Sequence, residues 1–567
     1  MVRGLMQETP LLISSLIEYA ARYHGDTEIV SRTTDGRVHR LGYRVLHERS
    51  QQLAAALTSR GVNPGDRIAT MAWNTHRHLE LYYAVSGMGA VLHTVNPRLF
   101  PEQLEYIINH AEDRLLFFDA TFLPLVQQLR PRLSSVKGFV LLGDAEQVAA
   151  ARKQFPDLAD LLGYEELIAA YSPGYVWPRF DEHTASSLCY TSGTTGHPKG
   201  VLYSHRSTVL HSFGVCAADG LGLSSRDSVL VIVPLFHANA WGVPYAAAMC
   251  GAKLVLPGAA LDGESVCQLL TSEGCNMSMG VPTVWLNFFA YIDKHPEKRP
   301  TALKKITVGG SAAPPALIRR FEKELGITVM HLWGMTETSP IGSSGSPPQK
   351  FVGRSADELL ALKSKQGRAI YGVEMKIVGE DGGELPRDGE AFGLLKVRGP
   401  WVVRRYYRDE GGEILDAEEF FSTGDVATLD GDGYMQITDR AKDVIKSGGE
   451  WISSIDLENS VMAHPAVQQA AVVGVPHPVW QERPLLLVIR KPGADVTAEA
   501  LRDFLRTRVA RWWLPDAVEF VGELPLTATG KVSKLTLRQR YRDYKLPEPQ
   551  DPAGPAGSAQ PPTAKAD

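Results

Sequence analysis

Cysteine, long uncharged apolar runs and an excess of basic charge are all scarce in this chain. The five cysteines among its 567 residues form no Cys-x-x-Cys pair. They exclude a disulfide scaffold and indicate free thiols in a reducing compartment, so we expect a cytoplasmic protein. No uncharged stretch reaches the roughly 18 residues of a membrane span, and Glu8, Glu18, Arg22 and His24 break up the apolar run that a signal peptide would need. The net charge of −5 offers no basic field for nucleic acid. Metabolites are therefore the expected partners, without nucleic acid or an integral membrane segment.

The length exceeds what one hydrophobic core usually supports, so we expect two or more domains. Through the first 250 residues, apolar runs alternate with helical periodicity. The pattern predicts a strand at Arg67–Trp73, a helix at His76–Met88, a strand at Leu92–Val95 and a helix at Pro101–Ala111. Such alternation is typical of βα units, in which helices cover largely parallel sheets.

The pattern changes twice further along the chain. From about residue 365 it becomes shorter strands and turns, as at Val373–Val378. Beyond Asp439 it predicts a compact α+β arrangement with a helix at Ser454–Met462, a helix from Thr497 to about Trp512, and a basic helix around Lys531–Tyr544.

The predicted fold class is α/β, with three parts. Residues 1–438 form a large N-terminal domain of layered, mainly parallel sheets and helices with a small β-barrel-like part. Residues 439–546 form a small α+β C-terminal domain. Residues 547–567 are rich in Pro, Ala and Gly and are predicted to be a disordered tail.

The most informative stretch runs from Tyr190 to Val201 and reads Tyr-Thr-Ser-Gly-Thr-Thr-Gly-His-Pro-Lys-Gly-Val. Its glycines allow backbone N–H groups to converge on phosphate oxygens, its hydroxyls can bind the same oxygens or a metal, and Lys199 adds positive charge. The spacing differs from the nucleotide-binding P-loop, which has Lys-Ser/Thr directly after its last glycine. Flanking strands at Ala185–Tyr190 and Val201–Tyr203 argue against a flexible surface linker. The stretch predicts another kind of triphosphate-binding loop.

The Asp-Gly-Asp-Gly run at Asp430 to Gly433 superficially suggests a calcium loop. It lacks the further ligands and the distal glutamate that such a loop requires. We therefore expect a hairpin turn there.

Further motifs follow the glycine-rich loop in order along the chain. They are Pro234 to Trp241, Gly309 to Pro314, Trp333 to Thr338, Ser422 to Asp425, Asp439 to Asp443 with Lys446 to Trp451, and Thr529 to Lys531. Together with that loop they resemble the adenylate-forming superfamily of acyl- and aryl-CoA synthetases, peptide-synthetase adenylation domains and firefly-type luciferases. The N-terminal half, including His93 to Gln103, is similar to bacterial medium- and long-chain fatty acid CoA ligases and to methylthiopropionate CoA ligases. The similarity covers about residues 6 to 545.

The resemblance implies a role for each matching residue. Lys531, Thr191 and Glu337 would be catalytic, and Thr191 and Glu337 would also be the magnesium ligands. Asp425, helped by Arg440, would accept hydrogen bonds from the ribose hydroxyls of the nucleotide. The other implied nucleotide and coenzyme A contacts are Ser192, Gly193, Thr194, Thr195, Lys199, Gly309, His331, Trp333, Gly334, Thr336, Lys442, Lys446, Gly448, Gly449 and Trp451. The implied acyl-pocket residues are His237, Ala238, Trp241 and Gly309.

The resemblance also implies the reaction. A carboxylate would attack the α-phosphate of ATP to give an acyl-adenylate and pyrophosphate, and the thiol of coenzyme A would then displace AMP. Mg²⁺ would assist the first step, in which two anions meet and a third leaves. The C-terminal domain would be a mobile lid that rotates about Asp439 between the two steps.

The acid is less well defined than the reaction. The segment from Phe236 to Cys250 is apolar and has no cationic side chain, which disfavours dicarboxylates and amino acids. Trp241 resembles the gating tryptophan of the fatty-acyl branch, although an ordinary core tryptophan would look the same. We expect a medium- to long-chain fatty acid or a related apolar acid. 3-Methylthiopropionate and an aryl or other short acid are the alternatives.

Three other function classes share most of these motifs. They are luciferase-like oxidation, loading of a carrier protein, and binding of an acyl nucleotide without catalysis. The chain has no phosphopantetheine-bearing segment after residue 546, and it retains Lys199, Glu337, Asp425, Arg440 and Lys531 together. Both observations favour the CoA ligase. The oligomeric state stays open between a monomer and a homodimer.

Overall fold

The computed structural model describes residues 1–191, 197–447, 450–527 and 532–547. These residues divide into two compact units: residues 1–441 and 526–527 belong to the first, and residues 442–525 and 532–547 belong to the second. All but the first residue of the predicted tail lies outside the described residues. No helix in the described part of the chain is long and apolar enough to cross a membrane.

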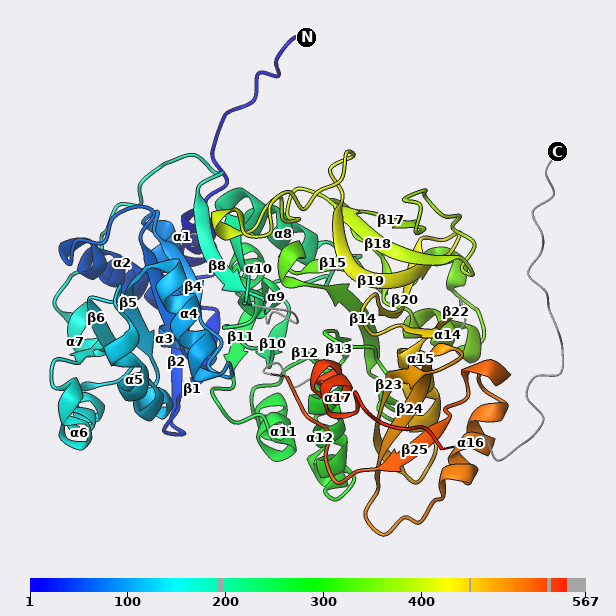
Figure 1. Cartoon of the computed structure of the whole chain (residues 1–567). Coiled ribbons are helices and arrows are strands. Elements are labelled where there is room, and N and C mark those ends of the chain that lie inside the picture. Colours follow the sequence, from blue (N-terminus) through cyan, green and yellow to red (C-terminus); the bar gives the residue numbers. More distant parts are fainter. Residues whose placement is uncertain (192–196, 448–449, 528–531, 548–567) are drawn as a thin grey trace. The chain divides into compact units, whose positions relative to one another are not determined.

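A seven-stranded sheet in the first unit has the order β7-β6-β5-β3-β4-β8-β9. Figure 1 labels its strands β4, β5, β6 and β8. Neighbouring strands run parallel, apart from β8 and β9, which run antiparallel. Their bounds are β3 Arg67–Met71, β4 Val91–Thr94, β5 Asp113–Phe118, β6 Gly138–Leu141, β7 Leu162–Gly163, β8 Ala185–Tyr190 and β9 Gly200–Ser204.

Helices cover both faces of this sheet. Along β5, Leu116 and Phe118 belong to a hydrophobic cluster that includes side chains of α4, α5 and α6. Leu115 and Phe117 point to the opposite face and belong to a cluster that includes α1, α2 and α3. Because alternate side chains of a strand point to opposite faces, a continuous apolar run such as Leu115–Phe118 fits a strand that is buried on both sides.

A thirteen-stranded sheet forms the rest of the strand framework of the first unit, with the order β17-β18-β19-β20-β16-β15-β14-β13-β12-β10-β11-β1-β2. Strands β1 and β10–β14 are joined by parallel pairings, and the pairings from β14 through β15 and β16 to β20 and β17 are antiparallel. The antiparallel strands correspond to the expected barrel-like part, and they are continuous with the parallel strands. The bounds are β1 Glu28–Arg32, β2 Val38–Gly42, β10 Ser228–Val231, β11 Lys253–Leu256, β12 Met277–Gly280, β13 Lys305–Val308, β14 Thr328–Gly334, β15 Ile341–Ser344, β16 Gly367–Ala369, β17 Glu374–Val378, β18 Phe392–Arg398, β19 Phe421–Leu429 and β20 Tyr434–Arg440.

Several helices of the first unit begin at residues with capping side chains. Thr75, Ser204 and Asp262 each accept a hydrogen bond from a backbone N–H of the first turn that follows. The helices are α1 Ile13–Tyr23, α2 Tyr43–Ser59, α3 His76–Gly87, α4 Pro101–Ala111, α5 Leu123–Leu129, α6 Ala145–Gln154, α7 Tyr164–Ala169, α8 His205–Cys216, α9 Ala238–Trp241, α10 Val243–Cys250, α11 Gly263–Ser272, α12 Pro282–Ile292, α13 Pro315–Arg319 and α14 Ala356–Ser364. The elements predicted between residues 67 and 111 are confirmed to within two residues.

The second unit has its own five-stranded sheet and core. The strands are β21 Ile445–Ser447, β22 Glu450–Ile452, β23 Val467–His477, β24 Gln481–Arg490 and β25 Ala517–Phe520, and the helices are α15 Ser454–Met462, α16 Ala498–Arg506 and α17 Lys534–Arg540. Buried side chains of β23 and β24 pack against Leu457 of α15 and Leu501 of α16. The predicted α+β arrangement of this segment is confirmed.

Two predicted helix bounds in this unit were wrong. The helix capped by Thr497 ends at Arg506 and not near Trp512, because Arg508 and Val509 both direct their N–H groups at the Leu505 carbonyl and close the last turn. The basic helix is shorter than predicted and begins at Lys534, where Ser533 caps it.

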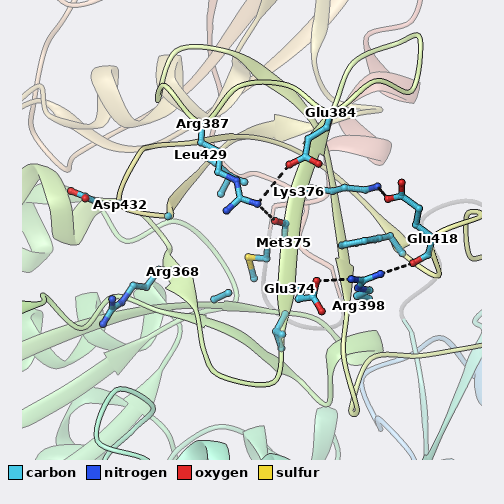
Figure 2. A pocket seen from close by; sticks show the side chains of 14 residues that line it. Arg368, Glu374, Met375, Lys376, Glu384, Arg387, Arg398, Glu418, Leu429 and Asp432 are labelled. Carbon is cyan, nitrogen blue, oxygen red and sulfur yellow. Dashed lines mark hydrogen bonds and ion pairs between the residues drawn. The ribbon is translucent and has the colours of Figure 1, made fainter.

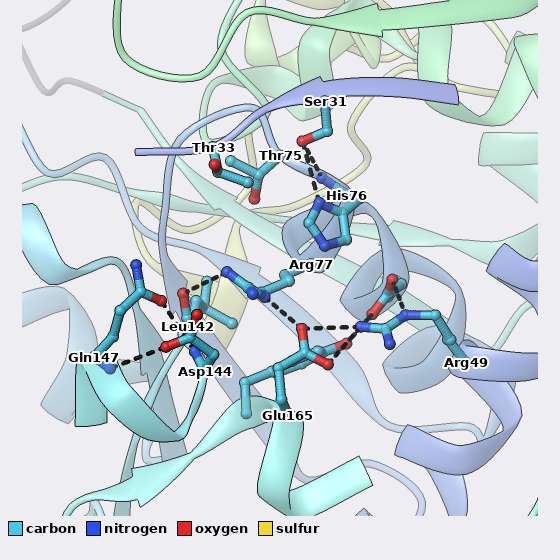
Figure 3. Close-up of polar contacts among 12 residues, drawn as sticks. Ser31, Thr33, Arg49, Thr75, His76, Arg77, Leu142, Asp144, Gln147 and Glu165 are labelled. Atoms are coloured by element: carbon cyan, nitrogen blue, oxygen red, sulfur yellow. Dashed lines mark hydrogen bonds and ion pairs between the residues drawn. The ribbon is translucent and has the colours of Figure 1, made fainter. Parts of the chain in front are cut away.

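A largely buried polar cluster joins α2, α3 and α7 of the first unit (Figure 3). Arg49 donates to Glu80 at 2.7 Å and to Glu165 at 3.0 Å, and Arg77 donates to Glu165 at 2.7 Å. The hydroxyl of Tyr164 donates to the other oxygen of Glu80. Burial raises the pKa of Glu80, and Arg49 opposes that rise. Arg49 is therefore the main group that opposes the effect of burial on this carboxyl group.

Replacing Arg49 by methionine should destabilise the protein by about 3–5 kcal/mol, because it leaves Glu80 buried without its cation. Arg320→Met is the matched control, since Arg320 pairs with Asp293 and Glu324 on the surface and such pairs contribute about 1 kcal/mol or less. Thermal unfolding followed by circular dichroism would compare the variants. Equal losses of stability would contradict the role given to the buried cluster.

Candidate functional site

The predicted nucleotide segment follows the last parallel strand of the thirteen-stranded sheet. Strand β14 pairs with β13 in parallel and with β15 antiparallel, so Trp333 and Gly334 lie at the carboxyl end of a parallel strand. That end is where open α/β sheets bind ligands. A Cβ atom at Gly334 would lie 1.8 Å from the Pro340 carbonyl oxygen, so only glycine fits at position 334, where the two backbone segments approach closely. Thr336 begins a short 3₁₀ turn, and its carbonyl oxygen accepts a hydrogen bond of 2.7 Å from Tyr203.

Glu337 lies in the same 3₁₀ turn and is buried, with 6% of its surface exposed. Its Oε1 accepts a hydrogen bond of 2.8 Å from the hydroxyl of Tyr406. Its carbonyl oxygen accepts a bond of 2.7 Å from the N–H of Val403. Burial raises the pKa of Glu337, while the Tyr406 hydrogen bond and the positive charge of Arg440 act in the opposite direction. A bound cation would therefore be a favourable partner for this carboxylate.

Asp425 lies on β19 between two donors. Its Oδ2 accepts a hydrogen bond of 2.9 Å from the indole Nε1 of Trp333, and its Oδ1 lies 3.6 Å from Nε of Arg440. Asp425 and Arg440 are also paired across β19 and β20. The structure therefore brings two predicted nucleotide residues, Trp333 and Arg440, to the carboxylate of a third, Asp425. The two oxygens of this carboxylate suit a diol.

The glycine-rich loop has an ordered stem. Tyr190 and Gly200 pair at the ends of β8 and β9, the N–H of Thr191 donates to the Lys199 carbonyl at 2.9 Å, and the N–H of Lys199 lies 3.3 Å from Oγ1 of Thr191. The predicted contacts Ser192, Gly193, Thr194 and Thr195 lie outside the described residues.

The ammonium group of Lys199 lies over the ring of Tyr406, 4.8 Å from its centroid. Tyr406 is the same residue whose hydroxyl binds Glu337. Two predicted residues that are 138 positions apart thus contact opposite parts of one side chain. Sequence reasoning missed Tyr406, because two adjacent tyrosines in a charged stretch carry no recognisable motif.

The predicted acyl-pocket segment has an unusual backbone. Ala238, Asn239, Ala240 and Trp241 have φ values of 43°, 51°, 49° and 58°, which is a turn in the left-handed region. The Asn239 amide donates to Ser187 at 2.9 Å and helps to fix this turn. Backbone strain of this kind persists only where the surrounding structure holds the residues in place, and it is common at functional sites.

The turn places Trp241 against Gly309. A Cβ atom at Gly309 would approach the Trp241 ring to 2.9 Å, so the glycine makes room for the indole. The structure therefore brings these two predicted acyl-pocket residues together. His237 immediately precedes the turn, and Ala238 is its buried first residue.

His331 lies in the interior of β14 with 1% of its surface exposed. Burial lowers its pKa to about 4, so the ring is neutral at pH 7. Its Nε2 accepts a hydrogen bond of 3.2 Å from the N–H of Ala313, and its Nδ1 has no partner among the described residues. The side chain holds the turn that follows Gly309 and Gly310 against the sheet.

The remaining predicted residues come from the C-terminal part of the sequence. Asp439 is buried on β20 opposite Val426, two residues before the division between the units. Lys442 and Lys446 belong to the second unit, and Trp451 lies in β22 of that unit. Gly448, Gly449 and Lys531 lie outside the described residues.

The described residues include no cluster of three or more His, Cys, Asp or Glu side chains that would hold a metal. The predicted magnesium ligands are one buried carboxylate, Glu337, and one hydroxyl, Thr191. Hard oxygen donors in such small number fit Mg²⁺, which commonly uses one or two carboxylates together with substrate phosphates and water.

A separate cavity of about 600 Å³ lies over the antiparallel strands (Figure 2). Arg368, Arg387, Arg398 and Lys376 line it. Each of these basic side chains pairs with an acidic one: Asp219, Glu384, Glu374 and Glu418, respectively. The charges of this cavity therefore satisfy one another, and no predicted site residue lines it.

Comparison with known proteins identifies the chain's relatives. Residues 17–407 match the family model described as AMP-binding enzyme, and residues 456–531 match the AMP-binding enzyme C-terminal domain. The chain is 53% identical over 540 residues to a 3-methylmercaptopropionyl-CoA ligase of Ruegeria lacuscaerulensis, covering 95% of this chain and 99% of the relative. It is 50% identical over 543 residues to a medium-chain-fatty-acid–CoA ligase of Ectopseudomonas oleovorans, covering 96% and 98%. An anthranilate CoA ligase solved in complex with anthranoyl-AMP superimposes with a TM-score of 0.82 at 25% identity, covering 94% and 99%.

Replacing Trp333 by phenylalanine should raise the KM for ATP about tenfold, because a hydrogen bond to a charged group is lost while the ring is retained. Trp401→Phe is the matched control, since its buried indole donates to the Ile341 carbonyl at 3.1 Å. Pyrophosphate release at varied ATP concentration would measure the effect. A normal KM in Trp333→Phe would exclude Asp425 and Trp333 as a nucleotide-binding pair.

Proposed function

Because this chain belongs to the AMP-binding enzyme family, we propose that it activates a medium- to long-chain fatty acid or a related apolar carboxylic acid. The chain is an acid–thiol ligase, an AMP-forming acyl-CoA synthetase that uses ATP and coenzyme A. The observation that carries the nucleotide site is the arrangement around Glu337 and Asp425. Glu337 accepts a hydrogen bond from Tyr406, whose ring also contacts Lys199. Asp425 is contacted by Trp333 and Arg440.

The first step needs charge neutralisation more than proton transfer, because a carboxylate attacks a phosphate and pyrophosphate leaves. Lys199 and the backbone of the loop that it closes would bind phosphate oxygens. Asp425 would bind the ribose and so fix the α-phosphate relative to the acid. Thr191 and Glu337 would hold Mg²⁺, which supplies positive charge for the phosphate oxygens when it is bound.

The C-terminal domain that the sequence predicts at residues 439–546 would supply different groups in the two steps. Lys531 would bridge the carboxylate and the α-phosphate during adenylation. After rotation about Asp439, Gly448 and Gly449 would line the path of the pantetheine arm. Lys442, Lys446 and Trp451 would contact AMP or that path. Glycine permits such close approach because it has no Cβ atom.

The apolar lining supports an uncharged acyl chain. Trp241 packs against Gly309 in the predicted pocket, and the segment from Phe236 to Cys250 has no cationic side chain. The similarity to the Ruegeria enzyme, whose name specifies 3-methylmercaptopropionate, supports a short thioether acid as the second candidate. An aryl acid is a third.

We further propose that the protein acts in the cytoplasm and forms a homodimer. The five cysteines are free thiols, which suits a reducing compartment.

Lys531→Ala should slow acyl-adenylate formation by roughly 10²-fold or more, the scale of losing a donor to the transition state. Thioester formation from supplied acyl-adenylate should stay nearly normal, because Lys531 acts only in the first step. Lys545→Ala, at an exposed position fourteen residues further along the chain, is the control. Rapid-quench measurements would give the rate of each half-reaction separately. An equal loss of rate in both half-reactions would refute the role given to Lys531.

The acid is tested by AMP release in the presence of coenzyme A across straight-chain, thioether and aryl acids. We expect the highest kcat/KM for a straight-chain acid of medium or greater length, because each buried methylene contributes about 0.8 kcal/mol to binding. If kcat/KM is highest for 3-methylthiopropionate, the short thioether acid would replace the fatty acid as the proposed substrate. AMP release that does not depend on coenzyme A would contradict the ligase itself.

A further inference from the structure

The segment from Val403 to Gly411 contacts both the phosphate-loop stem and the turn that carries Glu337. The N–H of Val403 donates to the Glu337 carbonyl at 2.7 Å. At the other end of the segment, Glu410 accepts a hydrogen bond of 2.7 Å from Tyr106, whose ring stacks on that of His197 at 4.3 Å. The segment therefore joins the two parts of the nucleotide site.

Tyr406 is the central residue of this segment. It is 8% exposed, so its ring and its hydroxyl are held in place by their surroundings. The hydroxyl donates to Oε1 of Glu337 at 2.8 Å, and the ring face lies 4.8 Å from the ammonium of Lys199. The hydrogen bond from the hydroxyl fixes the direction of the Glu337 carboxylate. The contact with the ring fixes the distance of the Lys199 ammonium from the ring face.

Gly411 limits Lys199 from another direction. A Cβ atom at Gly411 would lie 2.8 Å from the Lys199 ammonium, and its φ of +84° also favours glycine. The hydrogen bonds between Thr191 and Lys199 hold the lysine backbone. The ammonium group is thus held between the Tyr406 ring and the backbone at Gly411.

We propose that Tyr406 is a positioning residue for acyl-adenylate formation, which sets the Lys199 cation and the Glu337 carboxylate at a fixed separation around the ATP phosphates. This inference rests on the proposed function. The hydroxyl of Tyr406 orients Glu337 toward the metal that accompanies ATP, and the ring of Tyr406 directs Lys199 toward the phosphate oxygens. The two actions belong to different parts of one side chain, so two substitutions separate them.

Tyr406→Phe keeps the ring and removes the hydroxyl. It should weaken metal binding by about 10-fold, since loss of a group that orients a metal ligand typically costs 10- to 100-fold. The KM for ATP at saturating Mg²⁺ should stay close to the wild-type value. Tyr406→Leu removes the ring as well and should also raise the KM for ATP by roughly 3- to 10-fold, the scale of a lost cation–π contact.

The metal readout is binding of Mn²⁺ in the presence of a nonhydrolysable ATP analogue, followed by electron paramagnetic resonance. The kinetic readout is pyrophosphate release at varied Mg²⁺ and ATP. Tyr434→Phe is the matched control, because its buried hydroxyl donates to the Ser346 carbonyl at 2.6 Å outside the candidate site. Circular dichroism would verify that each variant is folded.

The proposal would be supported if Tyr406→Phe shifts the Mn²⁺ affinity without shifting the KM for ATP, and Tyr406→Leu shifts both. Wild-type metal affinity in Tyr406→Phe would overturn it, as would an equal shift in Tyr434→Phe. The proposed function is tested by a different result. If the wild-type protein binds Mn²⁺ with the ATP analogue but activates no acid, the proposed function is contradicted. The comparison of Mn²⁺ affinities between the wild type and Tyr406→Phe would still decide the role of Tyr406.

Discussion

The site depends on a buried carboxylate that has a neutral hydroxyl as its hydrogen-bond donor. Glu337 is 6% exposed, and burial disfavours its charged form. An uncompensated buried charge is costly, so the surroundings must supply positive charge or hydrogen bonds. Tyr406 supplies one bond, Arg440 contributes from a distance, and a metal ion with ATP would supply the rest. These surroundings therefore favour the binding of a cation beside Glu337.

The sheet explains why these residues meet. Strand β14 ends the parallel run of the thirteen-stranded sheet, and β15 turns back along it. The antiparallel strands then return the chain to the same edge, where β19 and β20 present Asp425 and Arg440 as a cross-strand pair beside Trp333. Trp333 and Asp425, which are 92 residues apart in the chain, thus converge within the first unit.

Local signals in the sequence predicted the elements well. Pro101 opens the helix predicted at Pro101–Ala111, and the run from Asp430 to Gly433 forms the expected turn between β19 and β20. The left-handed turn at Ala238–Trp241 and the role of Tyr406 had no such signal. Both arise from tertiary packing, against Gly309 in one case and between Lys199 and Glu337 in the other. The roles of Lys531 and Asp439 remain predictions, because they concern a lid movement and not a local pattern.

The most direct measurement is exchange of labelled pyrophosphate into ATP by the wild type and by Glu337→Gln, without coenzyme A. The account predicts that wild-type exchange requires the acid and Mg²⁺. It also predicts that the glutamine variant, which keeps the shape but lacks the charge, falls by roughly 10²-fold while it remains folded. Exchange by Glu337→Gln at the wild-type rate would contradict the claim that this buried carboxylate organises the nucleotide site.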